Sequence, residues 1–206
     1  MLAQQVHIDI IANNLANVNT PGYRADRMLT RAFPHHLIYR ADDAPFKNPV
    51  PIGPLGTGAY VDGTALSLEQ GALQRTGNPL HVAIVGDGFF AVETAAGLRL
   101  TRDGGFTIDG EGWLVTASGA RVLGQQGAIR LGDGTRPPSR VSIDESGGVW
   151  VDGQRVDTLL VVAVDNPAWL QKEGANLMVP SDASGEPYPL PQFRLQEGHR
   201  EGSNVQ

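Results

Sequence analysis

The residues of this chain that could carry chemistry begin with three nearby carboxylates, Asp103, Asp109 and Glu111. A pair of carboxylates can hydrolyse glycosidic bonds, and a set of oxygen ligands can bind calcium. Each of the three directly precedes a glycine, however, and Asp-Gly pairs are typical of tight turns. Their spacing also does not follow the ligand order of an EF-hand loop. We therefore interpret them as turn residues, with catalysis or calcium binding as the weaker alternative.

Two short motifs suggest other ligands but fit them poorly. His35 and His36 are adjacent, and neighbours in extended backbone point to opposite sides, so they do not predict a shared metal. The triplet 86–88, Gly-Asp-Gly, is similar to the start of a phosphate-binding loop but lacks the third glycine and a following lysine. A turn between strands explains the triplet better.

Nucleophilic catalysis has no visible starting residue, because the chain contains no cysteine and no Gly-x-Ser-x-Gly motif. Without cysteine, disulfides and thiolate metal sites are excluded as well. We predict that the protein is not an enzyme and has no catalytic residues, cofactor or metal site.

Composition narrows the class of partner. The formal net charge is −6 and the isoelectric point is near 5.3, so the basic surface that nucleic-acid binding requires is not expected. No stretch is apolar enough over about 20 residues for a membrane span, and the N-terminus does not resemble a cleavable signal peptide. We expect neither nucleic acid nor a membrane span.

The first element expected along the chain is an amphipathic helix within residues 1–19. Ile8, Ile11, Leu15 and Val18 recur at helical spacing. Leu2, Val6 and Ile10 are expected to widen this stripe. Proline at 21 and glycine at 22 predict that the helix ends near residues 17–19. A helix this short is marginal alone, so the stripe needs a partner.

The rest of the chain predicts a mainly β, antiparallel fold. Residues 20–63 are rich in proline and glycine and suggest an extended connector with short strands. From residue 64 to 200, short apolar runs alternate with turns, which indicates a β-rich domain. The expected strands are 82–85, 89–92, 98–101, 106–108, 113–116, 121–123, 128–131, 141–143, 149–151 and 159–164. The last run should be central and buried on both faces. Asp-Gly pairs at 103, 109, 133 and 152 are predicted turns.

Several blocks of residues resemble the bacterial flagellar rod and hook protein family. Residues 12–23 read ANNLANVNTPGY, which is similar to the N-terminal signature of that family. Residues 76–92 and 101–124 resemble its outer β domain, with His81 standing where an acidic residue is usual. The motif residues expected in turns or the core are Gly77, Pro79, Leu80, Gly86, Asp87, Gly88, Phe89, Phe90, Thr101, Arg102, Asp103, Gly104 and Phe106. Residues 174–177 and 201–205 are similar to the segment that leads into the family's C-terminal helix.

The resemblance implies a structural subunit that assembles helically with other rod and hook subunits. In that family the terminal helices are implied to pair as a coiled coil around the export channel and to transmit torque. The residues expected at subunit interfaces are Ile8, Ile11, Asn13, Asn14, Leu15, Asn17, Val18, Asn19, Pro21, Gly22 and Tyr23. The four asparagines have two interpretations, subunit contacts or simple helix termination.

The resemblance also implies export without a cleavable signal, contact with the flagellar export apparatus in transit, and a basal-body location outside the cytoplasmic membrane, in the periplasm or cell wall. Family members usually start earlier and continue past residue 206 into a long helix. Residues 201–206 are therefore expected to begin that helix, and the present chain is expected to be truncated at both ends and monomeric. The motifs do not distinguish a proximal from a distal rod subunit.

The main alternative function is an all-β adhesin or carbohydrate-binding module. Trp113, Trp150 and Trp169 could stack on a sugar if they were exposed together. This alternative offers no explanation for the signature in residues 12–23.

Overall fold

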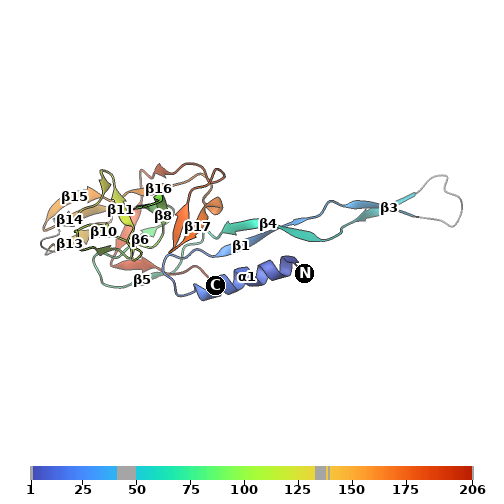
Figure 1. Ribbon diagram of the computed structural model, residues 1–206, viewed down its shortest axis with the longest axis horizontal. Helices are drawn as coiled ribbons and strands as arrows, with labels where there is room; N and C mark the ends of the chain where they lie inside the picture. The colour runs from blue at the N-terminus through green and yellow to red at the C-terminus, as the bar shows by residue number, and fades with distance from the viewer. Residues whose placement is uncertain (1, 41–49, 133–137, 139, 206) are drawn as a thin grey trace.

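The computed structural model describes residues 2–40, 50–132, 138 and 140–205. Within these residues, one α-helix, a long two-stranded ribbon and a β domain can be distinguished, and the helix lies beside the base of the ribbon (Figure 1). The strands are antiparallel throughout, which confirms the expected mainly β fold with one N-terminal helix.

Helix α1 spans Leu2–Ala16, so it ends just before the predicted range. Two further turns follow, because the amide of Asn17 bonds the carbonyl of Asn14 and the amide of Thr20 bonds that of Asn17, each at 3.0 Å. No residue of the helix is fully buried.

The expected single apolar stripe on α1 is wrong. At 3.6 residues per turn, Leu2, Val6 and Ile10 point to the side opposite Ile8 and Ile11 and do not widen their stripe. Apolar residues therefore lie on two sides of the helix. One side is partly buried at Ala3, Ile10, Asn14 and Asn17 and faces the chain's own strands. The other side carries Ile8, Ile11 and Leu15, and Val18 in the turn after the helix continues this stripe; the four side chains are 65, 51, 65 and 40% exposed.

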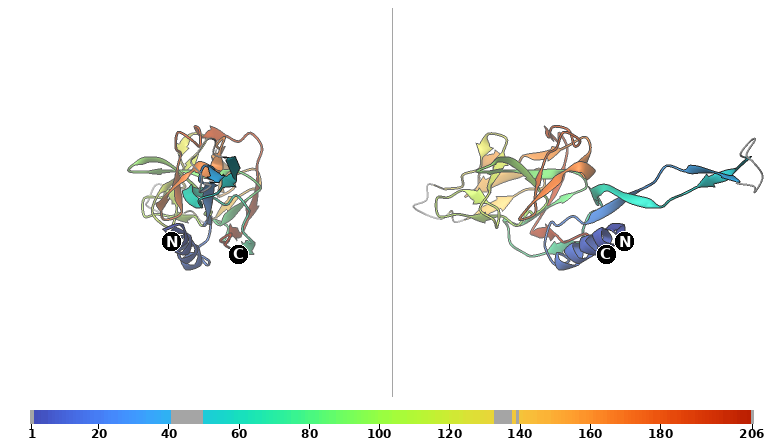
Figure 2. Two further views of the ribbon diagram at one scale, coloured as in Figure 1. Left: turned by 90° about the vertical axis from the view of Figure 1, so that its right-hand side faces the viewer. Right: turned by 45° about the vertical axis from the view of Figure 1, so that its right-hand side comes forward.

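The expected connector is a regular ribbon. Strand β1 (Asp26–Ala32) pairs with β4 (Ala59–Leu66), and β2 (His36–Arg40) pairs with β3 (Val50–Leu55). The two pairs continue one another and project from the β domain (Figure 2). Prolines 51 and 54 fit β3 because both strands of a two-stranded ribbon have a free edge. The boundary drawn between residues 63 and 64 falls inside β4.

The β domain contains the remaining strands. They are β5 (Leu73–Arg75), β6 (Val82–Val85), β7 (Phe89–Thr94), β8 (Gly97–Thr101), β9 (Thr107–Ile108), β10 (Leu114–Val115), β11 (Arg121–Gly124), β12 (Gly127–Ala128), β13 (Val141–Ile143), β14 (Gly148–Val151), β15 (Gln154–Thr158), β16 (Val161–Ala163), β17 (Gln171–Gly174), β18 (Leu177–Val179), β19 (Tyr188–Pro189), β20 (Arg194–Glu197) and β21 (His199–Glu201), with a 3-10 turn η1 at Pro167–Trp169.

The largest sheet runs in the order β17-β18-β8-β7-β11-β10-β9, and β16 pairs with β7 and β19. Strands β13-β14-β15 form a second sheet, while β20 pairs with β6 and β21 with β5. The C-terminal strands therefore return to the start of the β domain.

Strand β7 lies at the centre of the core. Its side chains alternate between two apolar clusters, with Phe90 and Val92 in one and Phe89 and Ala91 in the other. Strand β16 divides its residues in the same way, which confirms that run 159–164 is buried on both faces, although only Val161–Ala163 form the strand.

The predicted Asp-Gly turns have different outcomes. Asp152 and Gly153 both have positive φ, 49° and 85°, as a tight hairpin turn between β14 and β15 requires. Asp103-Gly104 is not a hairpin turn, because Gly104 packs directly against the carbonyl of Val82. The pair at 133–134 lies outside the described residues.

Candidate assembly junction

Three of the motif blocks meet where the N-terminal helix joins the β domain. Residues 21–24 arrive from α1, Arg102 follows β8, and Glu201 ends β21. We call this set of contacts, centred on Arg24, Arg102 and Glu201, the junction. It joins segments that are far apart in the sequence.

Glu201 is the centre of the junction and is only 2% exposed. One carboxylate oxygen, Oε1, pairs with Arg24 at 3.1 Å and accepts the amide of Gly71 at 3.0 Å. The other, Oε2, accepts Nε and Nη2 of Arg102 at 2.9 and 2.8 Å. A buried carboxylate is tolerated when it is paired and hydrogen-bonded, and Glu201 meets both conditions.

The two arginines also bond backbone carbonyls. Arg102 donates to the carbonyl oxygens of Gly88 at 2.6 Å and Gly86 at 2.9 Å. Arg24 donates to the carbonyls of Leu68, at 3.1 Å, and Glu69. The Gly86–Gly88 loop therefore presents carbonyl oxygens to a cation, which is the opposite of a phosphate-binding loop.

Burial lowers the pKa of Arg102, and the charge of Glu201 opposes that effect. Burial likewise lowers the pKa of Arg24, with Glu201 acting against it and the charge of Arg102 adding to it. Two buried cations thus share one buried carboxylate, so the buried charges of both arginines are compensated by Glu201.

The backbone of the two terminal segments is joined beside these charges. The amide of Gly22 bonds the carbonyl of Glu201 at 2.8 Å. Asn204 Oδ1 accepts the amide of Ala25 at 2.6 Å, while its Nδ2 donates to the carbonyls of Ser67 and Glu69 at 3.1 and 2.8 Å. Asn204 therefore holds the C-terminal segment against both the start of β1 and the end of β4.

Glycine at position 22 is required by close packing. Its φ is +70°, and a Cβ there would lie 2.5 Å from the amide nitrogen of Asp103. Asp103 in turn pairs with Arg200 at 2.9 Å and accepts the amide of Gly105 at 2.9 Å. The carboxylate that could have been catalytic is thus a structural contact between β8 and β21.

Asn14 fixes the helix to the ribbon. Its Nδ2 donates to the carbonyl of Asp26 at 2.9 Å, and its Oδ1 accepts the amide of Asp26 at 3.0 Å and the hydroxyl of Tyr23 at 3.1 Å. Lys172 completes this contact, with Nζ 2.8 Å from Asp26 and 3.9 Å from the centre of the Tyr23 ring. These bonds lie within one chain and give Asn14 a role beyond helix termination.

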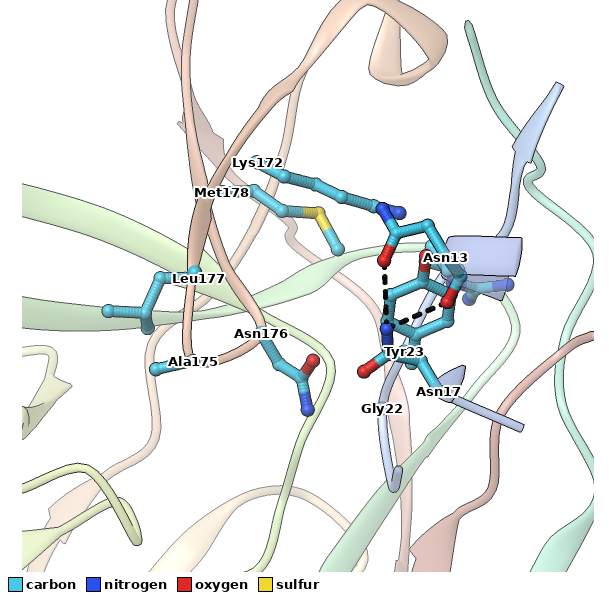
Figure 3. Close-up of a pocket in the computed structure, with 11 residues that line it drawn as sticks. Asn13, Asn17, Gly22, Tyr23, Lys172, Ala175, Asn176, Leu177 and Met178 are labelled. Atoms are coloured by element: carbon cyan, nitrogen blue, oxygen red, sulfur yellow. Dashed lines mark hydrogen bonds between the residues drawn. The ribbon is translucent and has the colours of Figure 1, made fainter. Parts of the chain in front are cut away.

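A small pocket of about 220 Å³ opens beside this contact (Figure 3). Asn13 and Asn17 line one side, where Asn17 Nδ2 donates to the carbonyl and to the side-chain oxygen of Asn13 at 2.9 and 3.1 Å. The β17–β18 turn lines the other side, and its Asn176 donates to the carbonyl of Pro21 at 2.8 Å. The turn has positive φ at both Ala175 and Asn176, which sets its tip against the signature.

The remaining motif residues fall into two groups. Phe89, Phe90, Thr101 and Phe106 are buried, and Leu80 packs against the same core. Gly77, Pro79 and Asp87 are exposed in the loops between strands. Among the expected interface residues, Asn13, Asn19 and the apolar stripe of α1 are exposed, whereas Gly22 and Tyr23 are buried within the chain.

The other candidate ligands serve turns or surface contacts. Asp109 Oδ1 accepts the amides of Glu111 and Trp113 at 2.9 and 2.8 Å. His35 and His36 lie exposed on the ribbon. In the described part of the chain, no three His, Cys, Asp or Glu side chains are grouped as metal ligands.

The three tryptophans make different contacts. Trp113 lies between Arg121 and Arg130, whose guanidinium carbons are 4.6 and 5.4 Å from its ring centre. Trp150 donates to Asp144 at 2.9 Å, and Trp169 lies apart from both in η1. None of the helices among the described residues is long and apolar enough to cross a membrane.

Sequence reasoning missed Arg24 and the junction role of Glu201 and Asn204. The available signal was that all three adjoin or lie within blocks already singled out, at residues 12–23 and 201–205. Charged residues next to such blocks, at opposite ends of the chain, were candidates for a buried pair.

These features define a β-rich structural protein whose two terminal segments are joined at one buried junction and whose N-terminal helix exposes an apolar stripe. Family comparison agrees with this class. Residues 1–24 match the family "Flagella basal body rod protein", and residues 83–151 match "Flagellar hook protein FlgE/F/G D1 domain".

Similarity along nearly the whole of this chain identifies its family. The flagellar basal-body rod protein FlgF of Caulobacter vibrioides is 33% identical over 199 residues, covering 97% of this chain and 76% of that protein. The rod protein FlgG of Borreliella burgdorferi is 34% identical over 222 residues, covering 100% and 81%. The hook protein FlgE of Helicobacter pylori is 38% identical over 146 residues, covering 66% and 19%. The chain belongs to the flagellar basal-body rod protein family.

Proposed function

We propose that this protein is a structural subunit of the flagellar rod and that the exposed stripe of α1 packs against neighbouring axial subunits. Family membership gives the flagellar basal body as the location and other rod and hook subunits as the partners. The observation that carries the proposal is the stripe of Ile8, Ile11, Leu15 and Val18, which no described residue of the same chain covers.

The spacing of the stripe suits a helical partner. Residues 8, 11, 15 and 18 follow the 3-4-3 pattern of a coiled-coil seam, in which each apolar side chain inserts between residues of the facing helix. When such contacts between identical subunits are heterologous and their rotation does not close a ring, they generate open helical assemblies. The opposite side of α1 is held on the ribbon through Asn14, so the stripe is presented outward in a defined direction.

The ribbon supplies a second contact surface. Phe33, Leu37, Ile38, Tyr39 and Leu55 are all at least 39% exposed. An isolated two-stranded ribbon is at best marginally stable in water, so a neighbouring subunit that covers these side chains would stabilise it. We infer that the β domain forms the outer part of the assembled subunit and that enzymatic activity is not part of its function.

Export by the flagellar apparatus, without a cleaved signal, also belongs to this proposal. It is supported by family membership.

The experiment is a charge scan of α1. The double variant Ile11→Glu/Leu15→Glu is expected to abolish motility and incorporation into purified basal bodies, because it places two carboxylates in the apolar seam. The matched control Gln5→Glu/Ala12→Glu adds the same charges to the same helix outside the stripe and should preserve both. Thermal unfolding by circular dichroism should be nearly unchanged for either variant, because all four side chains are exposed. Normal incorporation of the Ile11→Glu/Leu15→Glu variant would refute the proposal.

A further inference from the structure

His81 stands in the loop between β5 and β6. The loop packs against the turn between β20 and β21, because the amide of Gly198 bonds the carbonyl of His81 at 2.7 Å. The amides of Thr76 and Gly77 bond the carbonyl of Gly198 at 2.8 and 3.1 Å. This loop therefore holds the turn that leads into β21, the strand that carries Glu201.

The imidazole of His81 lies in a chain of hydrogen bonds whose direction is set at Asn78. At one end, Nδ1 of His81 lies 2.9 Å from the hydroxyl of Thr76, which is also 3.1 Å from the carbonyl oxygen of Gly198. Because a neutral imidazole has one N–H group, Nδ1 carries it whenever Nε2 accepts. At the other end, Oδ1 of Asn78 accepts the amide of Leu80 at 3.0 Å, which turns its Nδ2 toward Nε2 of His81 at 3.2 Å.

Nε2 must accept this hydrogen bond, so the arrangement requires a neutral imidazole. Protonation would place an N–H group of His81 against the N–H₂ group of Asn78. Rotating the Asn78 amide would relieve that contact only by breaking its bond to the amide of Leu80. A second proton on His81 thus costs at least one hydrogen bond in either orientation.

The surrounding charges act in the same direction on balance. Arg200 disfavours a positive imidazole, whereas Asp103, its partner in an ion pair at 2.9 Å, favours one. The other titratable groups on β5, β20 and β21 are Arg75, Arg194, Glu197, His199 and Glu201. The ring of His199 is engaged with the carbonyl of Glu197 at 2.8 Å and with Gln196. Burial, followed by the charge of Arg200, lowers the pKa of His81 below its usual value.

We propose that neutral His81 is a proton-sensitive lock that orders the β5–β6 loop through Thr76 and Asn78, and that this loop, bonded to the β20–β21 turn, thereby supports the strand carrying Glu201. The lock is a property of the single chain and is independent of the proposed function. Its consequence for assembly rests on that function, because loosening β21 would loosen the junction that orients α1.

The sign of the pH effect follows from linkage. The unfolded chain binds a proton near pH 6.5, whereas folded His81 resists it until a lower pH, so the folded state loses stability as the pH falls below about 6.5. The lock is fully engaged above that pH. Between the unfolded and folded pKa values of His81, this group should raise the unfolding equilibrium constant by up to about tenfold for each unit by which the pH falls.

The direct test is a histidine NMR titration of the whole chain. The ring resonances of His81 should titrate below pH 6.5, and the tautomer at neutral pH should carry its hydrogen on Nδ1. A midpoint at or above 6.5, or a hydrogen on Nε2, would overturn the proposal.

The second test compares urea unfolding at pH 7.5 and pH 5.5 for two variants. His81→Asn keeps an uncharged group that can donate to Thr76 but cannot be protonated, so it should remove much of the loss of stability on acidification. His199→Asn removes a neighbouring histidine and should leave that loss unchanged. An equal pH dependence in the wild type and in His81→Asn would contradict the lock. Should His81→Asn fail to fold, the wild-type titration still decides.

Discussion

The junction buries charged groups, whereas the helix and the ribbon expose large apolar side chains. At the junction, two arginines and a glutamate are almost fully buried, and each side chain has several hydrogen-bond partners in the same chain. In the helix and ribbon, large apolar side chains such as Leu15 and Leu37 are 65 and 52% exposed. Charged groups are thus inside and apolar groups outside, the reverse of the usual distribution.

The contrast distinguishes contacts that one chain makes within itself from surfaces that only another subunit can cover. The junction needs no other molecule, because its charges are matched within the fold. The stripe and the ribbon are complete only when another surface covers them. Substitutions in each region test this difference.

The largest expected effect is at Glu201. Replacing it with alanine leaves Arg24 and Arg102 buried without their carboxylate, and breaking a buried pair in this way costs about 3–5 kcal/mol. Urea unfolding of Glu201→Ala should show that loss. Glu145 pairs with Arg194 at the surface, where both side chains are about 70% exposed, and Glu145→Ala should cost less than about 1 kcal/mol. Similar losses for the two variants would mean that the junction is not a special site.

An intermediate effect is expected at Gly22. Alanine there has to adopt a φ of +70° and also places its Cβ against the backbone of Asp103, so the loss should exceed the roughly 1–2 kcal/mol of the backbone conformation alone. Gly77 is the matched control, since its φ is +73° but no atom lies within 4 Å of the Cβ position. Gly77→Ala should lose only the conformational part. Equal unfolding midpoints for the two variants would show that close packing at Gly22 has no energetic weight.

The smallest effect on folding is expected in the ribbon. Leu37→Ala should change the free energy of unfolding by no more than about 0.5 kcal/mol, because the side chain is exposed. The same change at fully buried Leu100 should cost about 2–5 kcal/mol. Incorporation into basal bodies should respond to Leu37→Ala despite its unchanged stability. A large loss of stability for Leu37→Ala would indicate that the ribbon is completed within the chain.

Periodicity in the sequence was enough to predict the fold class and many strands of the β domain. Runs such as 82–85 and 141–143 match strands because alternation reports burial directly. The sequence predicts the ribbon only as a connector with short strands, since its prolines suggest irregular structure and paired residues such as Asp26 and Leu66 are far apart in the sequence. Helical spacing alone does not fix the sidedness of α1, because two sets of apolar residues can each recur at that spacing on opposite sides of the helix.

The junction itself could not be derived from local patterns. Arg24, Arg102 and Glu201 are brought together only by the return of β21 to the start of the β domain, and nothing in the sequence around any one of them specifies the other two. The resemblance of blocks containing these residues marked the neighbourhoods but not the contact. Long-range pairing of this kind depends on topology.

The bond between Gly22 and Glu201 has a mechanical consequence. The covalent route from α1 to the β domain runs out along β1 and back along β4, whereas this hydrogen bond and the ion pairs beside it link residues 22–24 directly to β21. A twisting force applied at α1 therefore reaches the β domain through these cross-links as well as through the ribbon. Separating residues 22–24 from β21 would require these cross-links to break together, which makes the junction stiff against rotation.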